Sequence, residues 1–385
     1  MTVQSPLVRP WRRPAPRRPK SAFALLAGVS VLVLWALLPL DLSAQELCPE
    51  RYDVEVDGQV LSLPFCSTAP IDEPDPGIRR IVFSIHGVAT NAGTYFDNMV
   101  QAAERVPGAL DETLIIGPKL MTASFADDNE IGPTDVFWRT SSQRFWGGPS
   151  GSTDTHPRDV SISSFEIFDR LLTDLTDPDL FPNLEIVVLA GHSGGGQFTN
   201  RYAVTSRFEE EVARPRGVHI RYIVAQPSTH VYLTPERVDA EVRTRDEFAV
   251  PSTEVIDGCE GYNRYGSGLE GLEDWPYIAG VSPEQMESQF GPRDVIYFHG
   301  MNDSDPQGGA LARGCAAMMQ GAHRLERGIT YFNYVNHLYG EDGHNHRISF
   351  VARVGHDNRG MWASDQGLLH IFDYPVTVEE GPLVR

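Results

Sequence analysis

A serine enclosed by glycines is the first feature of the chain that could do chemistry, because residues 191–195 read GHSGG. This run fits the pattern G-x-S-x-G, in which small residues let the backbone turn sharply from a strand into a helix and expose the serine hydroxyl. A strand-like segment, 185–190, which is apolar after Glu185, precedes the run, and a helical pattern over 198–212 follows it. The context favours a nucleophilic Ser193 over an ordinary glycine-rich turn. It also predicts that the N–H of Gly194 helps to stabilise an oxyanion.

Two later segments could supply the base and the acid that a serine nucleophile needs. The strand-like segment 294–298 runs into a loop that contains Asp303 and Asp305. The last strand-like segment, 347–354, runs into His356. We predict that His356 is the base and Asp303 the orienting acid, with Asp305 as the alternative carboxylate.

A histidine-glycine pair offers the second oxyanion donor. The β-branched run 80–85 ends at His86 and Gly87, so a turn is expected directly after a buried strand. Since two aimed backbone N–H groups are needed, we predict Val88 as the second donor, with Ala89 as the alternative. A plain tight turn is the other interpretation of this pair.

The elements that must position these residues alternate between strand-like and helix-like patterns. Such alternation is typical of an α/β fold with a mostly parallel central sheet and helices on both faces. The predicted strands are 80–85, 113–116, 185–190, 219–225, 294–298 and 347–354, and the predicted helices are 164–175, 198–212 and 310–325. The stretch 226–292 breaks this pattern, and we interpret it as an irregular insertion within one catalytic domain, 45–385.

The serine turn, the histidine-glycine turn and the order Ser193, Asp303, His356 resemble the α/β-hydrolase superfamily from residue 79 to the C-terminus. More narrowly, the chain resembles a group of secreted bacterial and fungal serine hydrolases of mostly unassigned substrate. That narrower resemblance lies in GHSGGGQF (191–198), RYA (201–203), AQPS (225–228), Cys315, Gln320-Gly321 and Arg324. It implies serine hydrolase chemistry and a lid-like role for the insertion.

Aromatic residues near these motifs suggest where a substrate could lie. Tyr95 follows the histidine-glycine turn, while Trp138 and Trp146 lie between the second predicted strand and the nucleophile. They could line a substrate pocket or anchor loops to the core, and both interpretations stay open. If the insertion is a lid, four of its aromatic residues would face the substrate: Tyr262, Tyr265, Trp275 and Tyr277.

Cysteine usage points to an oxidising compartment. All four cysteines follow residue 44, and they are Cys48, Cys66, Cys259 and Cys315. An even count favours two disulfides over four free buried thiols, with three pairings possible. A hairpin predicted over 52–65 around an Asp-Gly pair favours Cys48–Cys66, which leaves Cys259–Cys315.

The first 44 residues look like an export signal. A Pro/Arg-rich stretch leads into the apolar run 22–40, and small residues follow up to Ala44. We predict cleavage after Ala44, with an uncleaved membrane anchor as the alternative. The protein is therefore expected to be secreted or periplasmic, or else anchored and facing outward, with membrane contact only if the segment is uncleaved.

Charge excludes one class of partner. The chain of 385 residues carries a formal charge of −20, and residues 45–385, with 26 basic and 51 acidic side chains, carry −25. Such a surface repels phosphates, so no nucleic-acid partner is expected. Lys119 is the only lysine among those 26 basic residues.

Taken together, the residues predict an exported serine hydrolase that cleaves a small-molecule or polymeric carboxylic ester. A peptidase or amidase on the same triad and a polyester depolymerase are the alternatives. A non-catalytic scaffold is disfavoured by the intact triad. No cofactor is implied. His344 and His346 could bind a metal, but two histidines on a glycine-rich loop are more often simply polar, so no metal is expected.

Overall fold

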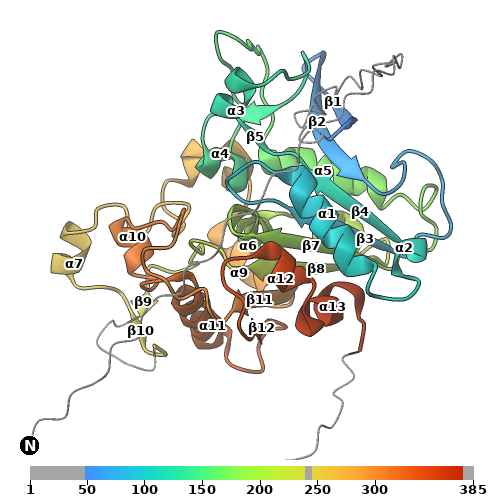
Figure 1. Ribbon diagram of the computed structural model, residues 1–385. Coiled ribbons are helices and arrows are strands. Elements are labelled where there is room, and N and C mark those ends of the chain that lie inside the picture. The colour runs from blue at the N-terminus through green and yellow to red at the C-terminus, as the bar shows by residue number, and fades with distance from the viewer. Residues whose placement is uncertain (1–47, 239–244, 376–385) are drawn as a thin grey trace, which may run out of the picture. The chain divides into compact units, whose positions relative to one another are not determined.

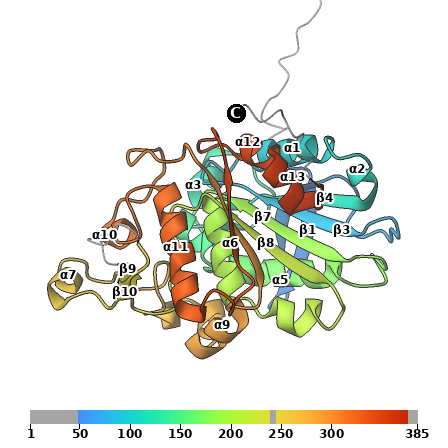
Figure 2. The same cartoon turned by 90° about the horizontal axis from the view of Figure 1, so that it is seen from below.

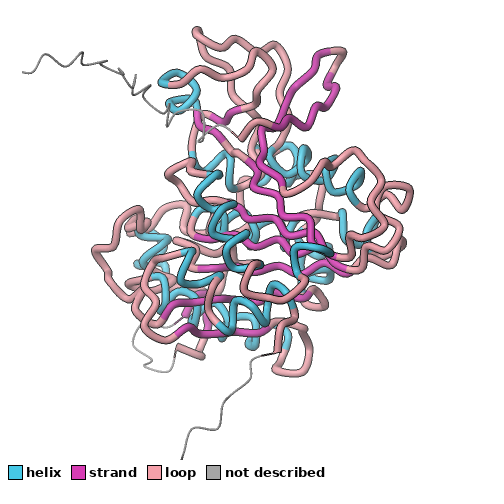
Figure 3. Tube along the Cα trace, turned by 45° about the vertical axis from the view of Figure 1, so that its right-hand side comes forward, coloured by secondary structure: helices cyan, strands magenta, loops and turns pink. Residues whose placement is uncertain are grey.

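Eight strands form the central sheet, in the order β1-β2-β4-β3-β7-β8-β11-β12 (Figure 1). The first two pairs, β1–β2 and β2–β4, are antiparallel, and all the following neighbours are parallel. The strands are β1 (Glu50–Val56), β2 (Gln59–Ser67), β3 (Arg80–Ile85), β4 (Thr113–Pro118), β7 (Ile186–His192), β8 (His219–Ala225), β11 (Asp294–Gly300) and β12 (Arg347–Val351). In Figure 3 the magenta strands lie side by side across this sheet.

The computed structural model describes residues 48–238 and 245–375, within the unit Asp41–Arg385. The predicted export segment, 1–44, therefore lies outside the described residues. No helix among the described residues has both the length and the apolar composition that a membrane crossing needs.

Helices cover both faces of the sheet, as Figure 2 shows. One face is covered by α1 (Ala92–Ala103), α2 (Ala109–Glu112), α12 (Asn358–Trp362) and α13 (Asp365–Phe372). The other face is covered by α5 (Ser164–Leu175), α6 (Gly194–Thr205), α9 (Pro283–Phe290) and α11 (Arg324–Tyr339). The predicted α/β class, with a mostly parallel sheet between two helical layers, is confirmed.

Short elements connect these layers. The small strands pair as β5 (Met121–Thr122) with β6 (Phe137–Trp138) and as β9 (Arg237–Val238) with β10 (Phe248–Ala249). The short helices are α3 (Ala123–Asp128), α4 (Ser141–Phe145), α7 (Thr253–Asp257), α8 (Pro276–Ala279) and α10 (Cys315–Met318). A π-helical turn spans Glu209–Ala213, and a 3₁₀ turn spans Leu272–Asp274.

The two helical layers bury alternate residues of the same strands. In β3, Ile81 and Phe83 face the layer that contains α5 and α6, while Val82 faces the layer that contains α1. Because successive strand residues point to opposite faces, a strand covered on both sides must be apolar throughout. This explains the unbroken apolar runs in the sequence.

The predicted helix 310–325 is wrong. The structure has only the four-residue α10 in this stretch, and α11 begins at Arg324. Gly321 lies at a φ of +143°, which interrupts a right-handed helix. The side chain of His323 then accepts a hydrogen bond from the N–H of Glu326 and caps α11.

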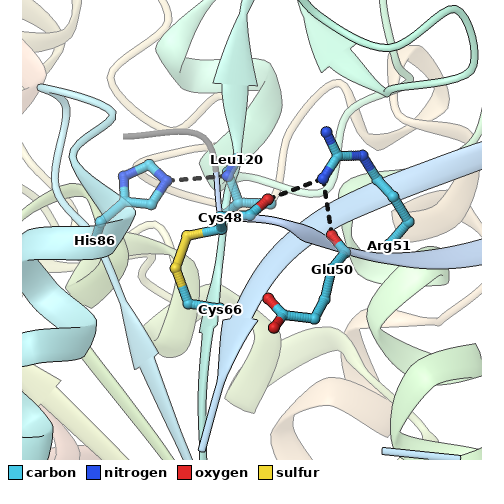
Figure 4. Close-up of a disulfide and its surroundings, with 6 residues drawn as sticks. All are labelled: Cys48, Glu50, Arg51, Cys66, His86 and Leu120. Carbon is cyan, nitrogen blue, oxygen red and sulfur yellow. Dashed lines mark hydrogen bonds between the residues drawn. A yellow bond between two sulfur atoms is a disulfide. The ribbon is translucent and has the colours of Figure 1, made fainter. Parts of the chain in front are cut away.

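The structure contains both disulfides of the favoured pairing. Cys48–Cys66 joins the ends of the β1–β2 hairpin (Figure 4), and Cys259–Cys315 joins the insertion to α10. The hairpin turns at Asp57 and Gly58, which have φ values of +48° and +79°. Two successive residues with positive φ form the turn that the Asp-Gly pair predicts.

Arginines carry most of the positive charge in the interior. Four of them are buried and donate to backbone oxygens, with no carboxylate within ion-pair distance among the described residues: Arg144, Arg201, Arg237 and Arg327. A guanidinium offers five donors in a rigid fork and can therefore join several loops at once. Lys119 is also fully buried.

Candidate active site

Ser193 occupies a strained turn between β7 and α6. Its φ of +58° and ψ of −114° are rare for a residue with a side chain, and such strain is typical of functional sites. Helix α6 can begin there because glycines let it approach the strands on either side. A Cβ at Gly195 would lie 2.0 Å from Ile85 O of β3, and one at Gly196 would lie 2.5 Å from Ala225 O of β8.

The structure brings Ser193, His356 and Asp303 into one hydrogen-bonded chain. Ser193 Oγ lies 3.0 Å from His356 Nε2, and His356 Nδ1 lies 2.8 Å from Asp303 Oδ2. Because the carboxylate accepts a hydrogen bond from Nδ1–H, Nε2 is left as the acceptor for the serine hydroxyl. The Asp303 side chain is 6% exposed and that of His356 is 28% exposed, so the acid is shielded while the base reaches solvent.

Hydrogen bonds join the acid loop to the histidine loop. Met301 N–H donates to Val351 O, and Asn302 N–H donates to Val354 O, both at 2.9 Å. These bonds hold the start of the acid loop against the loop that ends at His356.

Asp303 also has a cationic neighbour. Arg324, at the start of α11, places Nη1 3.6 Å from Asp303 Oδ1 and donates from Nη2 to Gly309 O. Asp305, the alternative carboxylate, is exposed and accepts a hydrogen bond from Gln307 N–H, which is the geometry of a surface turn.

A buried network that the sequence analysis missed lies beneath His356. His192 lies against the base, with ring centroids 4.6 Å apart. Tyr95 O–H donates to His192 Nδ1, and His192 Nε2–H donates to Gln226 Oε1, both at 2.8 Å. Gln226 Nε2 then donates to Gly355 O, next to the base, at 2.7 Å.

The two titratable groups of this network stay uncharged near neutral pH. Burial, with the nearby His356 as the next contribution, lowers the pKa of His192 well below its usual range. Burial raises the pKa of Tyr95 to about 12. The network beneath His356 is therefore held by hydrogen bonds between neutral groups.

Residues 86–90, which we call the oxyanion turn after their predicted role, lie directly against Ser193. A Cβ at Gly87 would lie 3.3 Å from Ser193 Cβ and 3.6 Å from Ser193 Oγ. Val88 is 38% exposed at this turn. Gly194, the other predicted oxyanion residue, begins α6, where unpaired N–H groups favour negative charge.

The three predicted substrate-binding aromatics have different surroundings. Tyr95 is buried in the network described above, and Trp138 is fully buried with Nε1–H donating to Gly148 O. Both positions favour the interpretation that these side chains anchor loops. Trp146 is partly exposed, and its Nε1–H points to Gln197 Oε1, 3.4 Å away on the first turn of α6. Of the three, Trp146 remains the candidate for substrate contact.

Aromatic residues of the insertion pack against the body of the protein. Tyr265 O–H donates to Trp146 O, and the Trp275 ring lies 6.1 Å from the Trp146 ring. Tyr277 O–H donates to Asp169 Oδ2 of α5. Tyr262 is buried and donates to Pro235 O within the insertion. The lid-like role of 226–292 stays a prediction.

The two histidines weighed as metal ligands have protein partners. His344 Nε2 lies 2.8 Å from Asn336 Oδ1. His346 bonds to Tyr297 O–H and to Phe290 O. Within residues 48–238 and 245–375, no three His, Cys, Asp or Glu side chains are grouped as a metal site requires.

No protein-family model and no curated protein matches the chain. Among solved structures, the chain is similar to LpqC, a poly(3-hydroxybutyrate) depolymerase from Bordetella parapertussis, at 20% identity and a TM-score of 0.55, over 88% of this chain and 95% of that one. It is also similar to poly(aspartic acid) hydrolase-1 from Sphingomonas sp. KT-1, at 21% identity and a TM-score of 0.46, over 82% of this chain and 96% of that one. The likeness to LpqC, with the strand order above, shows that this chain has the predicted α/β-hydrolase fold.

Proposed function

We propose that the protein is a serine hydrolase that cleaves carboxylic esters, with Ser193 as nucleophile, His356 as base and Asp303 as the acid that orients the base. The observation that supports this proposal is the hydrogen-bonded chain from Ser193 Oγ through His356 to Asp303. Its members lie at or after the carboxyl ends of three parallel strands, β7, β11 and β12, with β8 between the first two.

In the first half of the reaction, His356 Nε2 takes the Ser193 proton while Oγ attacks the ester carbonyl carbon. Asp303 keeps the Nδ1 proton in place and stabilises the imidazolium that forms. The oxyanion accepts hydrogen bonds from the N–H groups of Gly194 and Val88, at the N-terminus of α6 and in the oxyanion turn. The intermediate collapses when His356 returns the proton to the leaving alcohol.

The second half of the reaction repeats these roles with water. His356 takes a proton from water, and the resulting hydroxide attacks the acyl carbon bound to Ser193 Oγ. The same two N–H groups stabilise the second oxyanion, and the acid product leaves with Oγ reprotonated by His356. This sequence would need no cofactor.

A polyester is the second candidate substrate, because LpqC, to which the chain is similar, is described as a poly(3-hydroxybutyrate) depolymerase. A small ester and a polyester present the same bond to the triad. They differ only in the acyl and alcohol groups that must fit beside Trp146 and the oxyanion turn. A peptide bond differs in its leaving group, which the triad geometry does not report.

Export is part of the proposal. Two disulfides are compatible with an oxidising compartment outside the cytoplasm, and the predicted signal at 1–44 would direct the chain there. Sequencing the N-terminus of exported protein tests this, because cleavage after Ala44 would leave Gln45 first. An N-terminus upstream of residue 22 would favour the membrane anchor.

The test of the activity combines labelling with a substrate screen. A fluorophosphonate probe should label the wild type and should not label Ser193→Ala, which should also lose on the order of 10⁴–10⁶-fold in kcat while its melting temperature is unchanged. p-Nitrophenyl esters, peptide p-nitroanilides and 3-hydroxybutyrate oligomers should then separate esterase, amidase and depolymerase. An unlabelled wild type, or a Ser193→Ala variant that retains a few per cent of activity, would overturn the proposal.

A further inference from the structure

Arg144, on the short helix α4, is a buried cation that lies against the oxyanion turn. Its Nη2 donates to Val88 O at 2.6 Å, and its Nη1 donates to Thr90 Oγ1 at 2.6 Å and to Leu120 O at 2.7 Å. The residue is fully buried, and no carboxylate lies within ion-pair distance among the described residues. Burying a charge without a counter-charge is costly, so these hydrogen bonds must compensate for lost hydration.

His86 holds the preceding peptide group of the same turn. Leu120 N–H donates to His86 Nε2 at 3.0 Å (Figure 4), so the ring proton lies on Nδ1, which donates to Gly87 O at 2.7 Å. Burial and the charge of Arg144 lower the pKa of His86 to about 3, which keeps this neutral form. Leu120 therefore joins the two side chains, since its N–H binds His86 and its carbonyl binds Arg144.

The two held carbonyls fix the direction of two N–H groups. In a trans peptide the C=O and N–H bonds point in opposite directions, and the described residues contain no cis peptide bond. Because Gly87 O faces His86, Val88 N–H points the other way. Because Val88 O faces Arg144, Ala89 N–H also points away from the guanidinium. Neither N–H donates to an acceptor in the described part of the chain.

The residue next to Arg144 contacts the other half of the oxyanion site. A Cβ at Gly194 would lie 2.4 Å from Phe145 Cε2, so the Phe145 ring lies directly against the start of α6. The same ring packs edge-on against His86, with centroids 6.2 Å apart. Helix α4 thus contacts both backbone segments that would supply oxyanion donors.

We propose that Arg144 is a positioning residue, whose guanidinium fork holds the peptide groups of the oxyanion turn in the orientation that stabilises the tetrahedral intermediate. This inference rests on the proposed serine hydrolase function. The fork geometry carries the role: a single guanidinium reaches Val88, Thr90 and Leu120 at once, which an ammonium group cannot do in the same arrangement.

The experiment compares two variants with a matched control. Arg144→Lys keeps the charge and loses the fork. Its kcat on a p-nitrophenyl ester should fall about 10–100-fold with KM within about threefold, since loss of one oxyanion donor costs about 10²–10³-fold. Thr90→Val removes one acceptor and should lower kcat a few-fold. Arg237→Met is the control, because Arg237 is equally buried and carbonyl-bound but lies in the insertion and contacts no residue of the oxyanion turn.

A second readout separates positioning from loss of stability. A trifluoromethyl ketone forms a hemiketal oxyanion on a serine, so its inhibition constant should rise in proportion to the loss of kcat/KM in both test variants. Arg237→Met should lower the melting temperature and leave kcat and this inhibition constant unchanged at 25 °C.

Three outcomes would overturn the inference. The first is an Arg144→Lys variant with wild-type kcat and inhibition constant. The second is a loss that is no larger than in Arg237→Met. The third applies if Arg144→Lys does not fold: a Thr90→Val variant whose kcat and inhibition constant equal those of the wild type. If fluorophosphonate does not label the wild type, both the proposed function and this inference are overturned. If the wild type is labelled and one of the three outcomes occurs, only the role of Arg144 is overturned.

Discussion

Strand β11 has a carboxylate at each end, and the two carboxylates have different surroundings. Asp294, at the start of the strand, accepts hydrogen bonds from His219 Nε2 and Arg221 Nε, both at 2.9 Å, and pairs with Arg347. Partial burial alone raises the pKa of Asp294, but the hydrogen bonds and the nearby arginine charges outweigh burial and lower this pKa well below its ordinary range. Asp373 extends this ionic cluster by pairing with Arg221.

Asp303, beyond the other end of β11, is more deeply buried and is bonded to a single histidine, with Arg324 farther away at 3.6 Å. The loops at that end are held by a disulfide and by hydrogen bonds to backbone carbonyls, such as those from Arg324 to Gly309 O and from Gln226 to Gly355 O. The difference shows how one strand separates two tasks. Ion pairs hold the amino end of the strand, while the carboxyl end keeps Asp303 directed at His356.

Exchanging each carboxylate for its amide gives the largest expected contrast. Asp303→Asn should lower kcat about 10⁴-fold, because the histidine loses the acceptor that fixes its tautomer. Asp294→Asn should leave kcat within about twofold, because its partners lie at the opposite end of the strand. Steady-state kinetics at 25 °C measures both. Asp305→Asn serves as the control, and a larger loss there than in Asp303→Asn would show that the acid is Asp305.

Removing the Cys259–Cys315 disulfide should cause the largest loss in the free energy of unfolding. Replacing both Cys259 and Cys315 by serine opens a cross-link with a sequence separation of 56, worth about 4 kcal/mol on the entropic model. We also expect an altered ratio of kcat/KM for bulky and small esters, because the insertion is no longer tied to α10.

The hairpin disulfide provides the control for that prediction. The double serine variant of Cys48 and Cys66 opens a separation of only 18 and should lose about 3 kcal/mol. Urea unfolding measures both losses. An unchanged ester ratio in the variant of Cys259 and Cys315 would contradict a lid-like role for the insertion.

Disrupting the ionic cluster at the amino end of β11 should cause a smaller loss in the free energy of unfolding, and this loss should depend on pH. Asp294→Asn should cost about 1–2 kcal/mol at pH 7, less than a fully buried pair because the cluster is partly exposed. Since the folded-state pKa of Asp294 lies below its unfolded value of about 3.9, its stabilisation is present above pH 4 and declines as pH falls below that value.

Urea unfolding at pH 7 and pH 3 measures this dependence. The difference between wild type and Asp294→Asn should shrink at the lower pH, and also in 0.5 M salt at pH 7, where ion pairs are screened. A difference that does not change with either pH or salt would mean that Asp294 acts through packing or neutral hydrogen bonds.

The smallest expected effect is at the neutral network under the base. Gln226→Leu should lower kcat about 3–10-fold, because Gly355 O and His192 lose their partner and the histidine loop is held less firmly. Gln289→Leu is a matched control, since the Gln289 amide also binds two carbonyls, of Val204 and Ser206, away from the triad. Equal kcat values in the two variants would show that the network has no positioning role.

The sequence predicts those features that follow from local order along the chain. The strands before Ser193 and Asp303, β7 and β11, are buried on both faces, so each is a mostly apolar run that ends in its loop. The strand before His356, β12, lies at the edge of the sheet and is only partly buried, and its position in the sequence just before His356 is what predicts the base. The Asp-Gly turn similarly predicts the hairpin that closes the Cys48–Cys66 disulfide.

The rest depends on contacts between distant segments. Arg144 bonds to Val88 and Leu120, which are 56 and 24 residues away in the sequence, and His192 bonds to Tyr95, which is 97 residues away. Nothing in the local pattern of an arginine on a five-residue helix indicates these partners. The wrong helix at 310–325 has a related cause, because arginine side chains hold an irregular backbone there, as when Arg327 donates to Ala312 O.

The near absence of lysine has a practical consequence for handling the protein. Residues 45–385 contain one ε-amino group, and it belongs to Lys119, which is fully buried. Reagents that acylate lysine or form imines with it will therefore find no lysine side chain on the surface of the folded domain. Carbodiimide activation of the abundant surface carboxylates is the better route for attaching this domain to a solid support.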